Sequence, residues 1–128
     1  MSKPTILLVE DDKASSDITR LFLAGVCNID FAKDGFAAVE MAKKKKYPAI
    51  LMDIGLTKNM NGMQTTKEIR KLPGYENTPI VALTAYAMKG DKEEFLANGL
   101  TDYISKPFER SMLVEWVKKL LFGVSDSV

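Results

Sequence analysis

The sequence predicts an α/β fold in which one five-stranded parallel sheet lies between two layers of helices. Five short apolar segments, rich in β-forming residues, alternate along the chain with five stretches of helical character. Strands this short, separated by helices, indicate βαβ units with right-handed crossovers. The length of 128 residues and the hydrophobic fraction of 46% fit a single domain with one core.

The predicted strands share a high content of apolar and β-branched residues. They are TILLVE at 5–10, NIDFA at 28–32, AILMD at 49–53, PIVALT at 79–84 and DYIS at 102–105. The third and fourth are nearly continuous in apolar residues, which is typical of parallel strands buried on both faces. We therefore expect both faces of these two strands to be covered.

The predicted helices fill the segments between and after the strands. The first is indicated by apolar residues at helical spacing, namely Ile18, Leu21 and Phe22. The second is indicated in the same way by Ala38, Met41 and Ala42. A third helix follows Gly62, and a fourth lies between the last two strands. The last helix has the clearest apolar stripe, which we predict to pack into the core: Leu113, Trp116, Val117, Leu120 and Leu121.

The overall charge gives no general electrostatic reason to expect nucleic acid or an anionic membrane as a partner. Lys plus Arg, 18 residues, nearly cancels Asp plus Glu, 17 residues, so the net charge of +1 favours neither nucleic acid nor an anionic membrane. The single cysteine, Cys27, rules out an internal disulfide and fits a reducing compartment. No apolar segment is long enough for a signal peptide or a membrane span. We therefore expect a soluble cytoplasmic protein.

The sequence contains no histidine. This excludes Ser-His-Asp and Cys-His catalysis and histidine-rich zinc sites, and it means that the chain cannot carry a phosphohistidine itself. Its chemistry must therefore depend on carboxylates, hydroxyls and lysines.

Polar residues gather where the predicted strands end. They are Glu10, Asp11 and Asp12 after the first strand, Asp53 in the third, Thr84 in the fourth, and Lys106 with Pro107 after the fifth. Functional groups of parallel sheets collect at these carboxyl ends, so we expect the four sets to meet at one edge. Each set alone also has a plainer interpretation: an acid often marks the end of a buried strand, and Asp12 suits a helix N-cap.

Together, these groups suit phosphoryl transfer. Two carboxylates from the first strand, facing a third from Asp53, would repel one another unless a cation lay between them, and oxygen ligands favour a hard ion such as Mg²⁺ or Mn²⁺. A lysine and a hydroxyl near the same carboxylate could neutralise and hydrogen-bond the oxygens of a transferred phosphoryl group. Asp53 would then be the nucleophile, forming an acyl phosphate.

Four motifs resemble the receiver domains of two-component response regulators, free-standing or within hybrid histidine kinases. In chain order they are LLVEDD, LMDIGL, ALTAYA and YISKPF. The resemblance covers about residues 5–121, which we take as the core of a single receiver domain at 1–128. It implies a flavodoxin-like sheet with strand order 2-1-3-4-5.

The resemblance also assigns a role to each site residue. Asp53 matches the phosphoacceptor, Glu10 with Asp11 matches the acidic pair that holds Mg²⁺, and Gly55 matches the position whose backbone carbonyl completes the metal site. Lys106 matches the lysine that contacts the phosphoryl group and precedes a proline, Pro107, that is cis in the family. Thr84 matches the switch hydroxyl, and Tyr103 matches the aromatic residue whose rotamer follows it.

Partners follow from the same resemblance. The implied donor is a phosphohistidine on a histidine kinase or histidine phosphotransferase, and the implied output is a protein that binds the face formed by helix four, strand five and helix five. A homodimer through helices four and five stays open. The resemblance implies a signalling module, not a turnover enzyme, with no direct contact to nucleic acid or membrane.

The loop after Asp53 departs from the family pattern. It reads IGLTKNMNG, one residue longer than usual, with Thr57 where proline is expected. We therefore expect a less rigid loop and a less firmly oriented Gly55 carbonyl. Gly55 also offers no side chain to exclude water from an acyl phosphate, whereas Tyr86 could shield it.

Three alternatives fit parts of the pattern. DIGLT resembles the motif of haloacid-dehalogenase-type phosphatases, but Gly55 stands where their general acid must be. A flavodoxin-like or dinucleotide carrier would share the fold, but no Gly-rich phosphate loop occurs and the acids would repel phosphates. A degenerate receiver could keep the fold for protein contacts alone.

Overall fold

The computed structural model describes residues 3–56, 60–85 and 91–123. Its five strands form one parallel sheet in the order β2-β1-β3-β4-β5, so the predicted fold and strand order are confirmed. The strands are β1 (Thr5–Val9), β2 (Asn28–Ala32), β3 (Ile50–Asp53), β4 (Ile80–Thr84) and β5 (Asp102–Ser105). Glu10 lies just beyond β1, although its amide still donates to the Ala32 carbonyl at 3.0 Å, as if the ladder continued by one residue.

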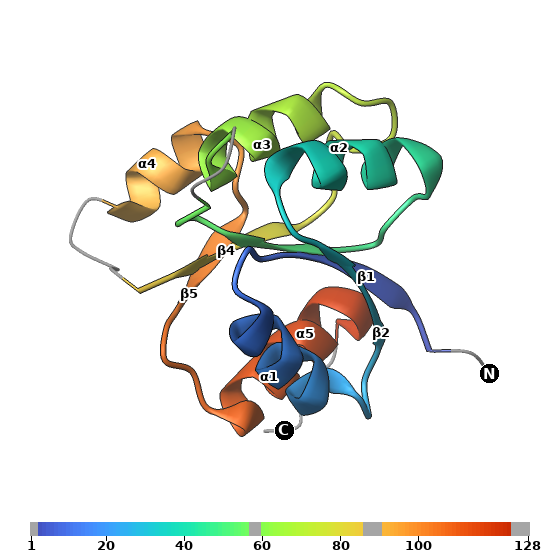
Figure 1. Cartoon of the computed structure of the whole chain (residues 1–128), viewed down its shortest axis with the longest axis vertical. Helices are drawn as coiled ribbons and strands as arrows, with labels where there is room; N and C mark the ends of the chain where they lie inside the picture. Colours follow the sequence, from blue (N-terminus) through green and yellow to red (C-terminus); the bar gives the residue numbers. More distant parts are fainter. Residues whose placement is uncertain (1–2, 57–59, 86–90, 124–128) are drawn as a thin grey trace.

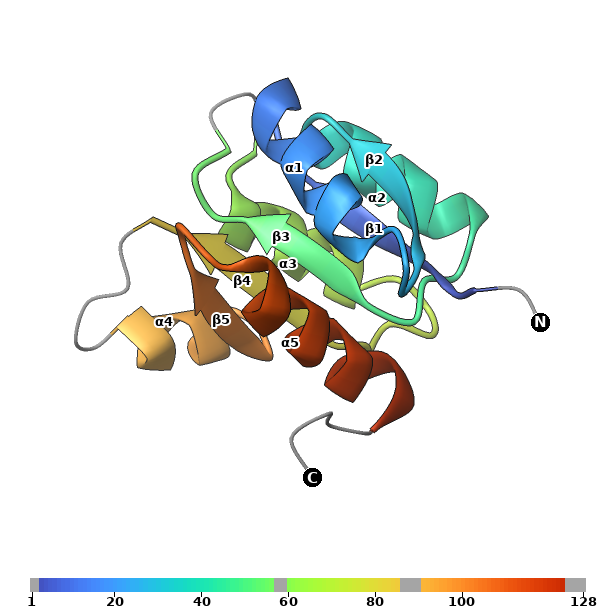
Figure 2. The same cartoon turned by 90° about the horizontal axis from the view of Figure 1, so that it is seen from below.

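Five helices cover the sheet on its two faces. They are α1 (Lys13–Leu23), α2 (Gly35–Lys44), α3 (Gly62–Arg70), α4 (Asp91–Ala97) and α5 (Arg110–Phe122). Helices α2, α3 and α4 lie on one face, whereas α1 and α5 lie on the other (Figure 1). Figure 2 shows α1 and α5 in front of the sheet on their shared face. The three-layer arrangement follows from the parallel strands, because each connection must cross one face of the sheet.

Alternate residues of each strand supply the two halves of the core. Leu7 and Met52 face α2, α3 and α4, whereas Leu8 and Leu51 face α1 and α5. All residues of β3 and β4 are buried, as their apolar sequences predicted. The site therefore lies at the ends of two strands that are buried along their whole length.

The last helix packs as predicted. Leu113 and Val117 are fully buried, and the other three residues of the stripe are partly buried against the same cluster: Trp116, Leu120 and Leu121. Its C-cap, Gly123, has a φ of 68°, a left-handed conformation that glycine adopts without strain. The stripe of α5 is therefore core.

Of the three residues that indicated helix α1, Phe22 packs against the core, whereas the other two lie on the outer face of the helix. Ile18 and Leu21 are 51% and 73% exposed, whereas Ser16 and Thr19 are buried. The Ser16 hydroxyl donates to the Lys13 carbonyl at 2.8 Å, so its burial leaves no unsatisfied donor. The apolar spacing thus identified the helix correctly, but only Phe22 of its three residues faces the core.

Among the described residues, no helix combines the length and the apolar character needed to cross a membrane.

Candidate functional site

Three carboxylates meet at the carboxyl end of the sheet. Glu10 and Asp11 follow β1, Asp53 ends the neighbouring β3, and one oxygen from each lies within 4.8 Å of the others. Glu10 is 2% and Asp53 7% exposed, whereas Asp11 is exposed, so the cluster opens to solvent on one side. Three acids at this spacing, offering only oxygen ligands, fit a hard divalent ion that keeps some of its waters.

Lys106 directly follows β5, which forms one edge of the sheet, and its side chain reaches the same cluster. Its Nζ lies 3.0 Å from Glu10 Oε2 and 3.8 Å from Asp53 Oδ1. The backbone amide of Lys106 donates to the Thr84 carbonyl at 2.7 Å, which fixes the chain after β5. The Lys106–Pro107 peptide bond is cis, the isomer that the family resemblance implied. The lysine therefore adds one positive charge to a group of three acids.

The surroundings of the Glu10 carboxyl group shift its pKa. Burial, followed by the neighbouring Asp53 carboxylate, raises the pKa of Glu10 to about 7, against the lowering effect of Lys106. Its Oε1 accepts a hydrogen bond from the Asp12 amide at 3.2 Å, while Oε2 bonds Lys106. A carboxyl group with a pKa raised in this way gains from a nearby cation, because the cation stabilises its charged form.

Asp53 is held by the backbone that follows it. Its Oδ1 accepts a hydrogen bond from the Gly55 amide at 2.9 Å, and the Ile54 amide donates to the Leu83 carbonyl of β4 at 3.0 Å. The first residue of α3 packs directly against this turn: a Cβ on Gly62 would lie 2.4 Å from the Asp53 carbonyl oxygen. Only glycine allows the helix to approach the site this closely.

Thr84 and Tyr103 lie on one face of the sheet. Ala82 pairs with Tyr103 and Thr84 pairs with Ser105, so Thr84 and Tyr103 both project to the side of Ala82, the face that α4 covers. Thr84 is buried at 7% exposure, and Tyr103 is half-buried with its ring 5.8 Å from that of Phe95 in α4. Thr84 and Tyr103 therefore share one face of the sheet, and the Tyr103 ring contacts α4 there.

The structure brings most of the predicted site residues together. Glu10, Asp11, Asp53 and Lys106 form one cluster, with Gly55 bonded to it and Thr84 at the end of the adjoining strand. Asp12 caps α1 by accepting a hydrogen bond from the Ser15 amide at 2.9 Å, so the plainer interpretation of this acid is confirmed. The departures noted at Thr57 and Tyr86 lie outside the described residues.

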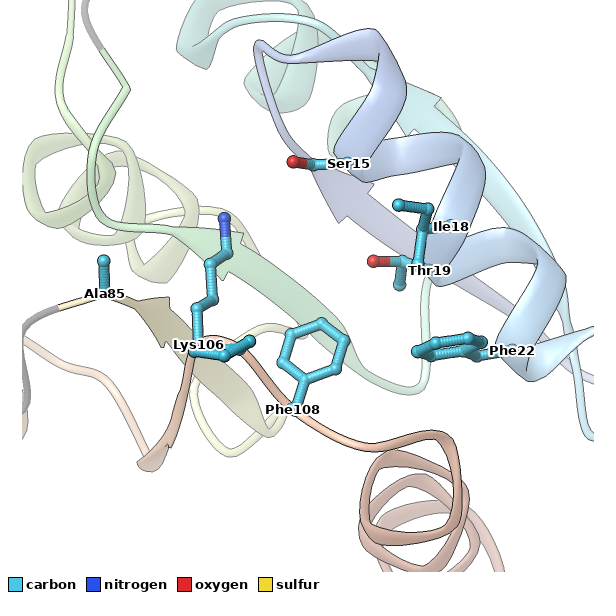
Figure 3. A pocket seen from close by; sticks show the side chains of 8 residues that line it. Ser15, Ile18, Thr19, Phe22, Ala85, Lys106 and Phe108 are labelled. Atoms are coloured by element: carbon cyan, nitrogen blue, oxygen red, sulfur yellow. The ribbon is translucent and has the colours of Figure 1, made fainter.

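An apolar groove beside the cluster was missed from the sequence. This groove, a cavity of about 390 Å³, lies between α1 and the segment after β5, and its lining comprises Ser15, Ile18, Thr19, Phe22, Ala85, Lys106, Pro107 and Phe108. Figure 3 shows the α1 side chains pointing toward Phe108 and Lys106. The rings of Phe22 and Phe108 meet edge to face at 6.4 Å. The apolar spacing on α1 could have indicated part of this groove, because Ile18 and Phe22 form the wall that α1 contributes.

Comparison with known proteins places this geometry in a family. Residues 6–118 match the family model described as the response regulator receiver domain. The chain is 36% identical over 110 residues to the signal transduction histidine-protein kinase BarA of Escherichia coli, covering 85% of this chain and 12% of that protein. It is 38% identical over 123 residues to the transcription factor prr1 of Schizosaccharomyces pombe, covering 95% of this chain and 22% of that protein. The chain thus spans less than a quarter of either relative.

Solved structures show the same fold. The receiver domain of the sensor histidine kinase PA1611 from Pseudomonas aeruginosa, solved with a magnesium ion coordinated in its active site cleft, matches with a TM-score of 0.85 and 36% identity over 94% of this chain and 98% of that one. The chemotaxis protein CheY4 of Vibrio cholerae matches with a TM-score of 0.88 and 26% identity, over 94% of this chain and 100% of that one. The matched structures include a receiver domain of a sensor histidine kinase, in agreement with the family model.

Proposed function

The chain belongs to the response regulator receiver domain family of two-component phosphorelays, and from this premise we propose that Asp53 accepts a phosphoryl group from a phosphohistidine. The observation that carries the proposal is the meeting of Glu10, Asp11, Asp53 and Lys106, which come from three different strand ends. A carboxylate that only marked the end of a strand would need neither the two acids nor the lysine beside it.

The transfer is a substitution at phosphorus. A carboxylate oxygen of Asp53 forms the new bond to phosphorus, while the bond from phosphorus to the imidazole nitrogen of the donor breaks and that nitrogen keeps the electron pair. Glu10, Asp11 and Asp53, with the backbone carbonyl of Gly55, would hold Mg²⁺ or Mn²⁺, which supplies neutralisation of the phosphoryl oxygens. Lys106 provides a second positive charge close to the attacking oxygen.

The product is a phosphorylated Asp53, which alters the surface of the protein. Thr84 contacts the phosphoryl group, and Tyr103 then turns toward the space that the threonine leaves, changing the surface of α4, β5 and α5 for an output partner. The contact between Tyr103 and Phe95 supports this route, because it joins β5 to α4. Gly55 stands where a phosphatase of the haloacid dehalogenase type needs its general acid, which favours a lasting phosphoaspartate over rapid turnover.

The groove beside Lys106 is the proposed docking surface for the donor. Its exposed apolar wall on α1 lies next to the cluster, so a histidine kinase or phosphotransferase helix seated there would bring its histidine near Asp53. The donor must come from another protein or another segment, because the sequence has no histidine. The receiver unit proposed here comprises residues 1–128 with its core at about 5–121, and we expect it to act in the cytoplasm.

Intact mass after incubation with a small acyl phosphate tests the proposal. Wild type should gain one phosphoryl group in the presence of Mg²⁺ and none without it, and Asp53→Asn should gain none. Asp12→Asn is the matched control, because asparagine caps a helix as well as aspartate does and should leave the gain unchanged. An equal gain by Asp53→Asn would place the acceptor elsewhere, and no gain by wild type would favour a degenerate receiver that serves protein contacts alone.

A further inference from the structure

We propose that helix α3 is a mechanical link between the backbone of Asp53 and the turn at residues 98–101, which joins α4 to β5. The link carries a displacement at the end of β3 along the helix to that turn. It rests on the proposed function in one respect, because phosphorylation of Asp53 is taken as its natural input. The contacts that form it are present in the unphosphorylated chain.

The first turn of α3 is in direct contact with the backbone of Asp53. A Cβ on Gly62 would collide with the Asp53 carbonyl oxygen and lie 2.9 Å from Ile54 Cα, so no free space separates the helix from the end of the strand. A capping box fixes this turn: the Asn61 side chain accepts from the Gln64 amide, and the Gln64 side chain accepts from the Asn61 amide. Because close-packed atoms transmit displacement, a shift of the Asp53 backbone has to move the start of α3.

One side of α3 leads from this contact to the turn after α4. Gly62, Thr66 and Arg70 are spaced by four residues, so they follow one another along the helix over about 12 Å. Thr66 is fully buried, and its hydroxyl donates to the Gly62 carbonyl at 2.9 Å. A Cβ on Gly99 would lie 3.5 Å from the Thr66 methyl carbon and 3.3 Å from Arg70 Cγ. The turn thus packs against two residues of this side.

Arg70 also holds the turn by a hydrogen bond. Its Nε donates to the Gly99 carbonyl at 2.9 Å, and its Nη1 donates to the carbonyls of Tyr75 and Thr78, each at 2.6 Å. Helix α3 lies beside α4 on the same face of the sheet (Figure 1), so this bond joins neighbouring elements. The two ends of α3 therefore contact the phosphoacceptor strand and the turn.

The turn is fixed to the elements on both sides of it. The Leu100 amide donates to the Phe95 carbonyl of α4 at 3.0 Å, and the Thr101 amide donates to the Ile80 carbonyl of β4 at 2.7 Å. Leu100 is 2% exposed, so the turn is anchored in the core. A displaced turn therefore alters the end of α4 and the start of β5.

This link differs from the proposed route through Thr84 in its starting point. The threonine responds to the phosphoryl oxygens and acts through Tyr103, whereas α3 responds to the backbone of Asp53 and acts on the turn. Because coupling between two sites is reciprocal, a partner that displaces the turn also acts back on Asp53.

A double-mutant cycle observed by amide NMR signals tests the link without a phosphoryl group. Gly62→Ala places a methyl group against the Asp53 carbonyl and displaces the start of α3. We expect it to shift the amide signals of Gly99 and Leu100, here called the turn signals. In an Arg70→Lys background this shift should be lost, because one ammonium can replace Nη1 but not also the Nε that bonds Gly99.

Two controls separate transmission along α3 from a general disturbance. Gly55→Ala also adds a methyl group beside Asp53 but meets only its Oδ1, at 3.5 Å, so the turn signals should stay in place. Lys71→Met changes an exposed lysine directly after α3, so Gly62→Ala should shift the turn signals in that background as it does in wild type.

The cycle can contradict the link in two ways. Turn signals that do not respond to Gly62→Ala would show that α3 carries no displacement. Equal shifts with and without Arg70→Lys would show that the displacement reaches the turn by another path. If Gly62→Ala does not fold, Asn61→Ala takes its place with the same expectation, because it removes the cap that fixes the first turn of α3.

Phosphorylation by a small acyl phosphate with Mg²⁺ provides the natural input. It should move the turn signals in wild type but not in Arg70→Lys, whereas the amide signal of Tyr103 should move in both, because Thr84 is unchanged. Intact mass of the same samples shows whether the phosphoryl group is present. A protein that gains no mass contradicts the proposed function and leaves the result of the Gly62→Ala cycle standing, whereas a phosphorylated wild type with unmoved turn signals overturns the link alone.

Discussion

The guanidinium of Arg70, at the end of α3, donates a hydrogen bond to the backbone carbonyl of Gly99 at 2.9 Å. The same side chain donates to the carbonyls of Tyr75 and Thr78, each at 2.6 Å. Gly99 has a φ of 95° and lies between α4 and β5, where a Cβ would also meet the Arg70 side chain at 3.3 Å. One arginine thus joins α3 to the turn that leads from α4 into β5.

Arg70→Met should therefore destabilise the fold. Three backbone carbonyls lose their charged donor, and we expect a loss of about 2–4 kcal/mol in the free energy of unfolding. Urea denaturation of both proteins measures it. The control is Lys71→Met, because Lys71 forms only an exposed pair with Glu68 and its loss should change stability by less than about 0.5 kcal/mol. Equal effects of the two changes would refute the role given to Arg70.

The two glycines near Asp53 should respond differently to the same substitution. A Cβ at Gly62 would lie 2.4 Å from the Asp53 carbonyl oxygen and 2.9 Å from Ile54 Cα, whereas a Cβ at Gly55 would meet only Asp53 Oδ1 at 3.5 Å. Gly62→Ala should cost about 1–3 kcal/mol through overpacking and lower the yield of phosphorylated protein. Gly55→Ala should preserve both the stability and the yield of phosphorylated protein, since alanine at position 55 keeps the backbone amide and carbonyl. Thermal unfolding and intact mass compare the two variants, and a harmless Gly62→Ala would contradict the close approach of α3.

The polar residues at the strand ends could be predicted because strands and periodicity are local properties. Apolar runs located the strands, and parallel strands bring their carboxyl ends to one edge whatever the details of packing. This was sufficient to bring Asp53 together with Glu10 and Asp11. The boundaries differ by one residue at Glu10, Ala49 and Pro79, where apolar or acidic character continues past the regular ladder.

Side-chain partners across the sheet could not be predicted in this way. Lys106 hydrogen-bonds Glu10 at 3.0 Å and forms a longer ion pair with Asp53 at 3.8 Å, and no local pattern sets this difference of 0.8 Å. The buried face of α1 was also hidden, because small polar residues such as Ser16 face the core there while Ile18 faces outward. The apolar spacing on α1 supplies one wall of the groove, but the opposite wall comes from the segment after β5, which no local pattern on α1 reports.

The contact between Tyr47 and Asp30 should make stability depend on pH. The Tyr47 hydroxyl donates to Asp30 Oδ2 at 2.7 Å, and this bond is the main cause that holds the pKa of Asp30 below its usual value of 3.8. A lowered folded-state pKa adds stability above the unfolded pKa, and that stability is lost as pH falls through the folded value. Tyr47→Phe should therefore cost about 1 kcal/mol at neutral pH, with Asp30 about a third exposed, and progressively less below about pH 4.

Urea denaturation of wild type and Tyr47→Phe between neutral pH and about pH 3 measures this difference. Lys45→Met is the control, because Lys45 also contacts Asp30 but through an exposed pair at 3.2 Å, and its loss should have the smaller effect. A difference between wild type and Tyr47→Phe that stays constant over the whole pH range would rule out the titration of Asp30 as its cause.

Removing the Thr84 hydroxyl should leave phosphorylation intact but prevent the structural change that phosphorylation causes. The Thr84 side chain lies at the end of β4, on the face that carries Tyr103, and does not belong to the acidic cluster. Thr84→Ala should gain a phosphoryl group as wild type does, but the change in hydrogen exchange that phosphorylation produces around Tyr103 and α4 should disappear. Thr84→Ser keeps the hydroxyl and should retain that change. An unaltered exchange pattern in Thr84→Ala would remove the threonine from the switch.

The exposed wall of the groove should matter only to a protein donor. Ile18 is 51% exposed on α1 and lines the groove beside Lys106, so Ile18→Glu places a charge where an apolar helix would dock without touching Asp53. We expect transfer from a phosphorylated histidine phosphotransfer domain to slow by about tenfold or more in kcat/KM, as for loss of one central interface residue. Phosphorylation by a small acyl phosphate should keep its wild-type rate.

The matched control for this change lies on the opposite face of the sheet. Leu96 is 47% exposed on α4, across the sheet from α1 (Figure 1), so Leu96→Glu alters a similar apolar surface away from the groove. It should leave both rates unchanged, because the proposed donor contacts α1 and the segment after β5. Rapid-quench kinetics with the two donors give the comparison. If Ile18→Glu slows both donors alike, the substitution disturbs Lys106 or Asp53 instead of docking, and if Leu96→Glu slows the protein donor equally, that donor binds the α4 face.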